Sequence, residues 1–262
     1  MKMEHVNKVK LLSGIVLLGV LQSGLLSCSK ENPLKRTFTS SFENVSDFDG
    51  FYITPQGHLN SSFHDLSDSI VFTGSLAHRA WIKGSNPPST STVNNNHRGY
   101  PTVQLYKTSG GSFTTPCYIT FKVWLDMPLQ ASQNGGENDW FSFATFSDDE
   151  TDGWARTILV NLSYDGHLHL QHVPNQGQQQ YIFQTSTVVF PQKEWVEVKV
   201  YLDFGKGKYA KVWQNGVLVS HAHIENINNQ LSQAHFGLYA PPQIESGVVF
   251  NDELIIEMVD GE

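Results

Sequence analysis

Apolar and polar residues alternate along several segments in the second half of the chain. Ile119, Phe121 and Val123 fall on one face of an expected strand, while polar or amphipathic side chains fall on the other. Residues 196–202 repeat the pattern, with valines at alternate positions. An alternation with a period of two predicts strands that turn one face to a core and the other toward solvent, as in an antiparallel sheet.

Two dipeptides that favour tight turns separate pairs of such segments. Asp165-Gly166 predicts a hairpin that joins residues 158–163 to residues 167–173, and Asn215-Gly216 predicts one that joins residues 209–214 to residues 217–223. After residue 40, helical periodicity is expected only in a turn or two at residues 226–233. Many strands, tight turns and almost no helix predict an all-β fold class, an antiparallel β-sandwich or jelly roll.

The N-terminus has the pattern of an export signal. Lys2, Lys8 and Lys10 precede an apolar stretch at residues 11–26, which is shorter and more interrupted than the roughly 20 apolar residues of a spanning helix. The sequence Leu-Leu-Ser-Cys that ends at Cys28 resembles the lipobox of bacterial lipoproteins. This resemblance implies cleavage before Cys28 and lipidation of its thiol. The alternative is an uncleaved anchor with an incidental cysteine.

This reading divides the chain into three parts. Residues 1–27 are expected to be a lipoprotein signal peptide, residues 28–37 a lipidated tether, and residues 38–262 a single β-jelly-roll domain. The protein is then expected in the bacterial cell envelope, anchored by lipid to the outer membrane, with no other contact to the membrane.

The charge of the chain argues against one class of partner, and its cysteine content argues against a disulfide. The chain has a formal charge of −8, and loss of three lysines and one glutamate with residues 1–27 leaves 14 basic and 24 acidic side chains, a charge of −10. Such a balance disfavours nucleic acid as a partner, because the summed field repels polyanions. With Cys28 lipidated, Cys117 is the sole remaining cysteine, so no intrachain disulfide is expected.

Two segments resemble a known fold. Residues 211–219, with Trp213 and Asn215-Gly216, resemble a hairpin common in concanavalin A-like domains, which include laminin-G modules and several polysaccharide lyases. Residues 246–256 resemble the terminal strand of these domains, which often pairs with the first strand, here beginning at Phe38. The resemblance implies a concanavalin A-like jelly roll and, by itself, little about function.

A third segment resembles a catalytic strand. His235-Phe236-Gly237-Leu238-Tyr239 is similar to the K-x-G-x-Y strand of jelly-roll polysaccharide lyases related to alginate and heparin lyases, with His235 in place of the lysine. The resemblance implies that Tyr239 transfers protons. The families also use a histidine and a glutamine two residues apart, for which the chain offers His169 and Gln171 in reversed order, and an arginine-rich strand, whose arginine-glutamate-arginine pattern is absent here.

A uronate-cleaving site would be chemically coherent with these residues. β-Elimination requires a group that neutralises the carboxylate, a base for the C5 proton and an acid for the leaving oxygen. Arg98, Gln104 or Gln171 could neutralise the carboxylate, and His169 with Tyr239 could move the protons. Alternation alone also places polar residues such as His169 on outer sheet faces, and a tyrosine such as Tyr239 is often a packing residue.

Other residues are candidates for binding. Trp124 and Tyr201 on polar strand faces could stack against sugar rings, and His97 could donate hydrogen bonds to them. By the same resemblance, Glu43 and Asp252, from the first and last strands, could hold a structural calcium ion, although two carboxylates need further oxygen ligands. No organic cofactor is expected. The acidic residues at 148–152 are predicted to be a loop or a calcium-binding rim rather than the paired carboxylates of a glycosidase.

Three functions follow. The first is a cell-envelope lipoprotein that acts on polysaccharide, as a lyase of uronate-containing glycan. The second is a glycan-binding lipoprotein without activity, whose groove would have rings but no converging His, Tyr and Arg. The third is an adhesion module of the laminin-G type, with a flat face and no groove.

Overall fold

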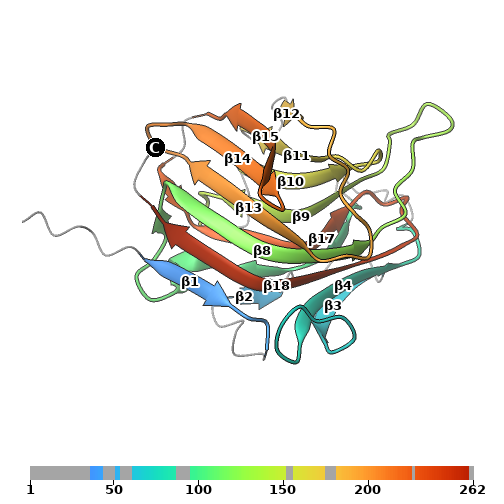
Figure 1. Cartoon of the computed structure of the whole chain (residues 1–262), viewed down its shortest axis with the longest axis horizontal. Coiled ribbons are helices and arrows are strands. Elements are labelled where there is room, and N and C mark those ends of the chain that lie inside the picture. Colours follow the sequence, from blue (N-terminus) through green and yellow to red (C-terminus); the bar gives the residue numbers. More distant parts are fainter. Residues whose placement is uncertain are drawn as a thin grey trace, which may run out of the picture. The chain divides into compact units, whose positions relative to one another are not determined.

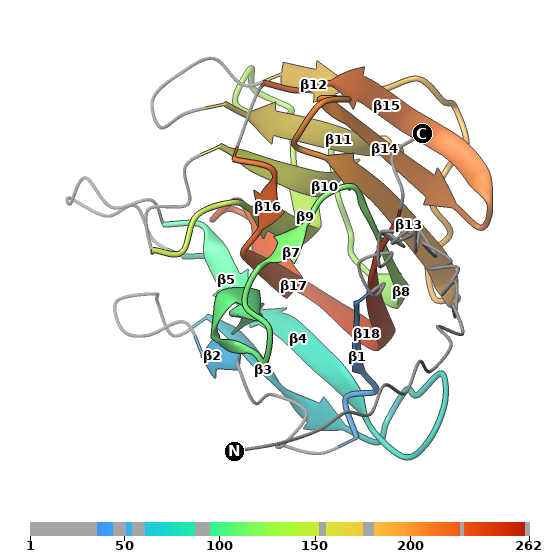
Figure 2. The ribbon, with the colours of Figure 1, turned by 90° about the vertical axis from the view of Figure 1, so that its left-hand side faces the viewer.

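The computed structural model describes residues 36–43, 51–53, 61–86, 95–151, 156–174, 181–225 and 228–259, all within the unit Lys35–Glu262. These residues form two large antiparallel sheets that face each other, and Figures 1 and 2 show the two layers from directions 90° apart. The predicted signal peptide and lipidation site at Cys28 lie outside the described residues. Within the described part, no helix is long and apolar enough to cross a membrane.

One sheet is built around the longest strand, β18, and is called the β18 sheet. Its eight strands are, in spatial order, β15 (Val217–His223), β14 (Tyr209–Gln214), β13 (Val196–Asp203), β8 (Cys117–Asp126), β18 (Ser246–Met258), β4 (Ala77–Lys83) and β3 (Ser62–Ser67), with β1 (Thr37–Ser40) also paired to β18. Phe38 of β1 lies opposite Ile256 of β18. The predicted pairing of the first and last strands is therefore confirmed.

The other sheet is called the β17 sheet, after its central strand. Its eight strands are, in spatial order, β12 (Tyr181–Phe183), β11 (Leu168–Val173), β10 (Thr157–Ser163), β9 (Trp140–Ser147), β17 (Gln233–Ala240), β6 (Pro101–Val103) and β2 (Phe51–Ile53), with β5 (His97–Gly99) also paired to β17. A small ladder joins β7 (Phe113–Thr114) to β16 (Gln230–Leu231), and a short 3-10 turn spans Leu105–Lys107.

The predicted hairpins form at the expected turns. Asn215 and Gly216 both have positive φ angles, of 47° and 80°, as a tight two-residue turn requires. In the other hairpin only Gly166 has a positive φ angle, of 83°, because the turn there is wider and the amide of Gly166 donates to the carbonyl of Ser163. The helical turn expected at residues 226–233 is wrong for the described residues from 228 onward, since Leu231 pairs with Phe113 in a strand ladder.

The core lies between the two sheets and explains the alternating pattern. Ile119, Phe121 and Val123 are fully buried, and the Phe121 ring contacts Phe236 of the opposite sheet with a centroid distance of 5.2 Å. Burial of such a side chain contributes about 1.5–3 kcal/mol. Cys117 is also buried in this core and unpaired, so the described part of the fold is held together by apolar packing and backbone hydrogen bonds.

Candidate functional site

The outer face of the β17 sheet carries two rows of side chains that cross its strands. In the first row, Arg98 pairs with Tyr239, Tyr239 with Ser142, Ser142 with Asn161, and Asn161 with His169. In the second row, Thr102 pairs with His235, His235 with Thr145, Thr145 with Leu159, and Leu159 with Gln171. The register thus brings residues that are far apart in the sequence onto one surface.

Between the two ends of these rows lies a strip of short side chains on β9, which we call the trough. Strand β9 contributes only the short side chains of Ser142 and Thr145 to the floor. Tyr239 and His235 of β17 stand on one side, and Asn161 of β10 stands on the other. Since neighbouring strands lie about 4.8 Å apart, the backbones of β17 and β10 are about 10 Å apart across β9.

Much of this face is polar and yet buried, which distinguishes it from an ordinary solvated sheet face. Asn161 is 2% exposed, and Thr102 and Gln233 are fully buried, although none of the three belongs to the apolar core. Among the described residues, the side-chain oxygens Oδ1 of Asn161, Oγ1 of Thr102 and Oε1 of Gln233 accept no hydrogen bond. A recessed surface with spare acceptors suits a ligand that is rich in hydroxyl groups.

Tyr239 lies at the centre of one wall of the trough. Its hydroxyl accepts a hydrogen bond of 2.9 Å from Nδ2 of Asn96, and its ring centroid is 5.3 Å from that of Trp140. The guanidinium carbon of Arg98 is 5.6 Å from the centroid of the same ring. The Tyr239 hydroxyl is thus oriented by an amide and flanked by a fixed positive charge.

His235 lies four residues before Tyr239 on the same face of β17. Its ring stacks on that of Tyr100, with a centroid distance of 3.9 Å. Burial, and secondly the positive charge of Arg98, hold the pKa of His235 well below its ordinary value of 6.5. The imidazole is therefore neutral at pH 7.

His169 and Gln171 stand on β11, one strand beyond Asn161. Nδ1 of His169 lies 3.3 Å from the carbonyl of His167 and donates to it, which leaves Nε2 as an acceptor. Burial lowers the pKa of His169, so this ring is also neutral. Nδ2 of Asn161 donates a 2.5 Å hydrogen bond to Oε1 of Gln171, which joins the two amides into one polar group.

The structure brings together four of the five residues predicted to be catalytic: Arg98, Tyr239, His169 and Gln171 share the two rows. The fifth, Gln104, follows β6 directly after Val103, which pairs with Ala234. Its distance from Tyr239 along β17 is about 17–20 Å at 3.3 Å per residue. Gln104 therefore lies on the same side of the sheet but outside the trough.

The residues predicted to bind sugar do not gather at this trough. His97 is fully buried, donates to the carbonyl of Ile244 at 2.9 Å and contacts the side chains of Asn86 and Ser61, an arrangement that fixes the local backbone. Trp124 lies on the outer face of the β18 sheet, where its ring contacts Phe250. Tyr201 lies on that same outer face and is 3% exposed.

The two carboxylates predicted to hold calcium bind the same loop. Oδ2 of Asp252 accepts from the amides of Phe72 and Thr73, at 3.0 and 3.1 Å, and the carboxylate of Glu43 accepts from the amide of Ser75. Within the described part of the chain, no three His, Cys, Asp or Glu side chains are grouped as a metal site would require. The two carboxylates are therefore better suited to holding this loop in place than to binding a cation. The calcium site stays a prediction.

Several residues of the trough were not identified from the sequence. Asn161 could have been found, because it interrupts the apolar run Ile158-Leu159-Val160-Asn161-Leu162 of a strand that is otherwise buried. Asn96, Tyr100 and Trp140 give no such local signal. They reach Tyr239 and His235 only through the pairing of β5, β6 and β9 with β17.

Solved structures with the same architecture include polysaccharide lyases. An endo-β-1,4-glucuronan lyase from the fungus Trichoderma reesei has a TM-score of 0.58 and 14% identity, over 85% of this chain and 95% of that one. The cellulose induced protein Cip1 has a TM-score of 0.53 and 13% identity, over 84% and 96%. The alginate lyase Aly36B has a TM-score of 0.51 and 13% identity, over 86% and 98%.

These similarities lie in the fold and not in the sequence. No protein-family model matches the chain, and no curated protein matches it. The similarity nevertheless covers most of both chains in each comparison, and the two-sheet antiparallel topology agrees with it. The chain has the jelly-roll β-sandwich fold of these polysaccharide lyases.

Proposed function

We propose that this protein is a polysaccharide lyase that cleaves a uronate-containing glycan by β-elimination, in the trough on the outer face of the β17 sheet. The observation that carries the proposal is the register that aligns Arg98, Tyr239 and Asn161 in one row, with His235 on the same face of β17 in the adjacent row. The similarity in fold to a glucuronan lyase and an alginate lyase supports the same class of substrate.

The reaction assigns a task to each wall of the trough. The uronate ring lies over Ser142 and Thr145, where short side chains leave room for it. The amides of Asn161 and Gln171 face its carboxylate with N–H donors, which stabilises the charge that develops on the carboxylate as the C5 proton leaves. On the opposite wall, Arg98 and Tyr239 face the glycosidic oxygen.

Proton transfer is assigned to His235 and Tyr239. The neutral imidazole of His235 accepts the C5 proton, the bond between C4 and its glycosidic oxygen breaks, and the Tyr239 hydroxyl donates a proton to the leaving oxygen. The products are a new chain end and a sugar with a C4–C5 double bond. His169 pairs with Asn161 on the opposite side of the trough from His235 and Tyr239, and in this proposal it supports Asn161 and transfers no proton.

Turnover can be followed by the ultraviolet absorbance of the unsaturated uronate during incubation with alginate, glucuronan, ulvan, chondroitin or pectin. With one of these polymers we expect the absorbance to rise, and Tyr239→Phe to lower kcat by about 10²–10⁴-fold, the typical contribution of a positioned acid or base. Tyr164→Phe, an exposed tyrosine in the β10–β11 turn, is the matched control and should keep full activity.

The same assay distinguishes the two histidines. His235→Ala should abolish turnover, whereas His169→Ala should reduce it while the pH profile keeps its shape. Loss of activity in His169→Ala with retention in His235→Ala would reassign the base to His169. Flat traces with every polymer would refute the lyase and leave a glycan-binding protein as the better reading.

Export and anchoring complete the proposal. A lipid on Cys28 would place the trough at the surface of the cell envelope, where polysaccharide is accessible, and only the lipid would contact the membrane. Incorporation of radioactive palmitate into the wild-type chain, and its absence in Cys28→Ala, is the expected result.

A further inference from the structure

The outer face of the β18 sheet, on the opposite side of the sandwich, carries a second cluster of aromatic and charged side chains. We name it the lysine–tyrosine patch, and it consists of Tyr118, Lys199, Tyr201, Tyr209, Lys211 and Trp213. Tyr118 pairs with Tyr201 and Tyr201 with Lys211, while Lys199 pairs with Trp213 in the adjacent row. The patch therefore spans the three neighbouring strands β8, β13 and β14.

The lysines of the patch lie over the rings. Nζ of Lys199 is 3.9 Å from the centroid of Tyr118, and Nζ of Lys211 is 5.2 Å from that of Tyr201 and 5.7 Å from that of Tyr209. Cation–π contacts hold ammonium groups beside ring faces. A ligand on this face would meet apolar ring surface and positive charge together.

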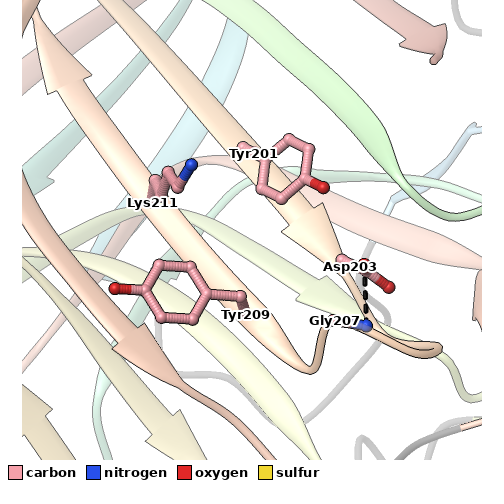
Figure 3. A pocket seen from close by; sticks show the side chains of 5 residues that line it. All are labelled: Tyr201, Asp203, Gly207, Tyr209 and Lys211. Carbon is pink, nitrogen blue, oxygen red and sulfur yellow. Dashed lines mark hydrogen bonds between the residues drawn. The ribbon is translucent and has the colours of Figure 1, made fainter. Parts of the chain in front are cut away.

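A hollow lies at one end of the patch. It has a volume of about 330 Å³ and is lined by Tyr201, Asp203, Gly207, Tyr209 and Lys211, whose side chains are grouped together in Figure 3. Both carboxylate oxygens of Asp203 accept a hydrogen bond of 2.9 Å from a backbone amide, one from Gly205 and the other from Gly207. The acidic residue is thus engaged in holding the turn.

The charge around the hollow is opposite to that of the whole protein. The exposed Lys206 and Lys208 belong to the turn between β13 and β14, so residues 199–213 carry four lysines and a single acidic residue, Asp203. Glu257, which pairs with Tyr118 at the far border, is the acidic neighbour on that side. In a chain with a formal charge of −8, this local excess of lysine favours an anionic ligand.

We infer that the lysine–tyrosine patch is a second, non-catalytic binding site for an anionic polysaccharide. The partly exposed rings of Tyr118, Tyr209 and Trp213 are the surfaces on which pyranose rings stack, with the buried Tyr201 beneath them, and the lysines bind the carboxylates. The choice of ligand rests on the proposed function, because the same acidic polymer could then contact both faces. Two linked contacts raise the effective concentration of the polymer at the trough without any change in the trough itself.

A purely structural account of the patch makes a different prediction. Cross-strand aromatic pairs stabilise a sheet by about 0.2–1 kcal/mol each, and lysine stems commonly lie over apolar surface. If that were the whole role of the patch, removal of its lysines would change stability slightly and polysaccharide binding not at all.

Affinity electrophoresis separates the two accounts. The full chain with Tyr239→Phe, whose turnover is expected to be strongly reduced, is run in gels that contain one of the five acidic polymers or uncharged hydroxyethyl cellulose. We expect retardation by one or more acidic polymers and a rise of about tenfold in Kd when Lys199→Gln and Lys211→Gln are added, which corresponds to about 1.4 kcal/mol. Lys199→Arg with Lys211→Arg should restore the retardation.

Lys83→Gln with Lys193→Gln is the control for net charge, because it removes two exposed lysines outside the patch. Equal retardation of the patch variant and this control would overturn the inference, as would the absence of any retardation. Turnover by the wild-type chain with no effect of the patch lysines would refute the second site and keep the lyase. Lysine-dependent binding without turnover would refute the lyase and keep the second site.

Discussion

Gly237 offers a direct test of how the fold supports the trough, because it lies between His235 and Tyr239 where β17 is irregular. The register of β17 against β9 shifts between Phe236 and Tyr239, and Gly237 has a φ angle of 135°. A Cβ atom at this position would lie 2.5 Å from the carbonyl oxygen of Gly99 and 2.9 Å from Cε1 of His78. Only glycine fits there without displacement of β5, which carries Arg98.

Gly237→Ala should therefore destabilise the protein through two effects. The unfavourable backbone conformation costs about 1–3 kcal/mol, and forcing a methyl group against rigid backbone costs about 1–3 kcal/mol more. We expect a loss of about 4 kcal/mol in the free energy of unfolding, measured by urea denaturation of the wild type and the variant. Turnover per folded molecule should fall as well, because the clash moves Arg98 relative to Tyr239.

Gly216→Ala is the matched control. Gly216 also has a positive φ angle, of 80°, but a Cβ atom there would meet nothing within 4 Å. Gly216→Ala should lower the free energy of unfolding only through the unfavourable backbone conformation, by about 1–2 kcal/mol. Equal losses in the two variants, or a stable Gly237→Ala protein with full activity, would refute the assignment of Gly237 as the residue that sets the spacing between β5 and β17.

Three further predictions concern stability. Burial lowers the pKa of six histidines, that of His78 to about 3, so the unfolded chain binds more protons at acidic pH; the other five are His64, His97, His169, His172 and His235. Stability is then fully present above pH 6.5 and should fall as the pH drops below 6.5 toward the lowered pKa values, by up to about 1.4 kcal/mol per pH unit and histidine; a flat profile in urea titrations would contradict this. Asp252→Ala removes the acceptor of the Phe72 and Thr73 amides and should cost about 2–4 kcal/mol, against less than about 1 kcal/mol for Asp65→Ala, which breaks a surface ion pair with Arg79. A rise in Tm on addition of calcium that Asp252→Ala abolishes would establish the predicted metal site, and an unchanged Tm would exclude it.

The sequence by itself determined the fold class and several of its pairings. Alternation at Ile119, Phe121 and Val123 requires one buried face, since a shift of one residue would expose all of them. Asn215-Gly216 dictates a tight hairpin because few other residues accept positive φ angles at both turn positions. These features are local, and local steric and solvation effects are sufficient to decide them.

The candidate site was only partly determined in this way. Tyr239, Arg98, His169 and Gln171 were named from a resemblance, but their relative positions depend on the register of β5, β9, β10 and β11 around β17. Asn161 and the short floor residues Ser142 and Thr145 acquire significance only once these strands are paired. The residues before and after a position in the sequence show whether it belongs to a strand. Which residues lie opposite it on adjacent strands depends on contacts between distant segments.

The assignment of faces was likewise decided by tertiary structure. Trp124 and Tyr201 have the same alternating pattern as the residues of the trough, yet they lie on the other sheet, and His97 is enclosed by Asn86, Ser61 and Ile244. Alternation separates the inner from the outer side of a strand but carries no information about which sheet the strand joins. That choice is made by the packing of the two sheets around a common core, because only one arrangement buries both apolar faces at once.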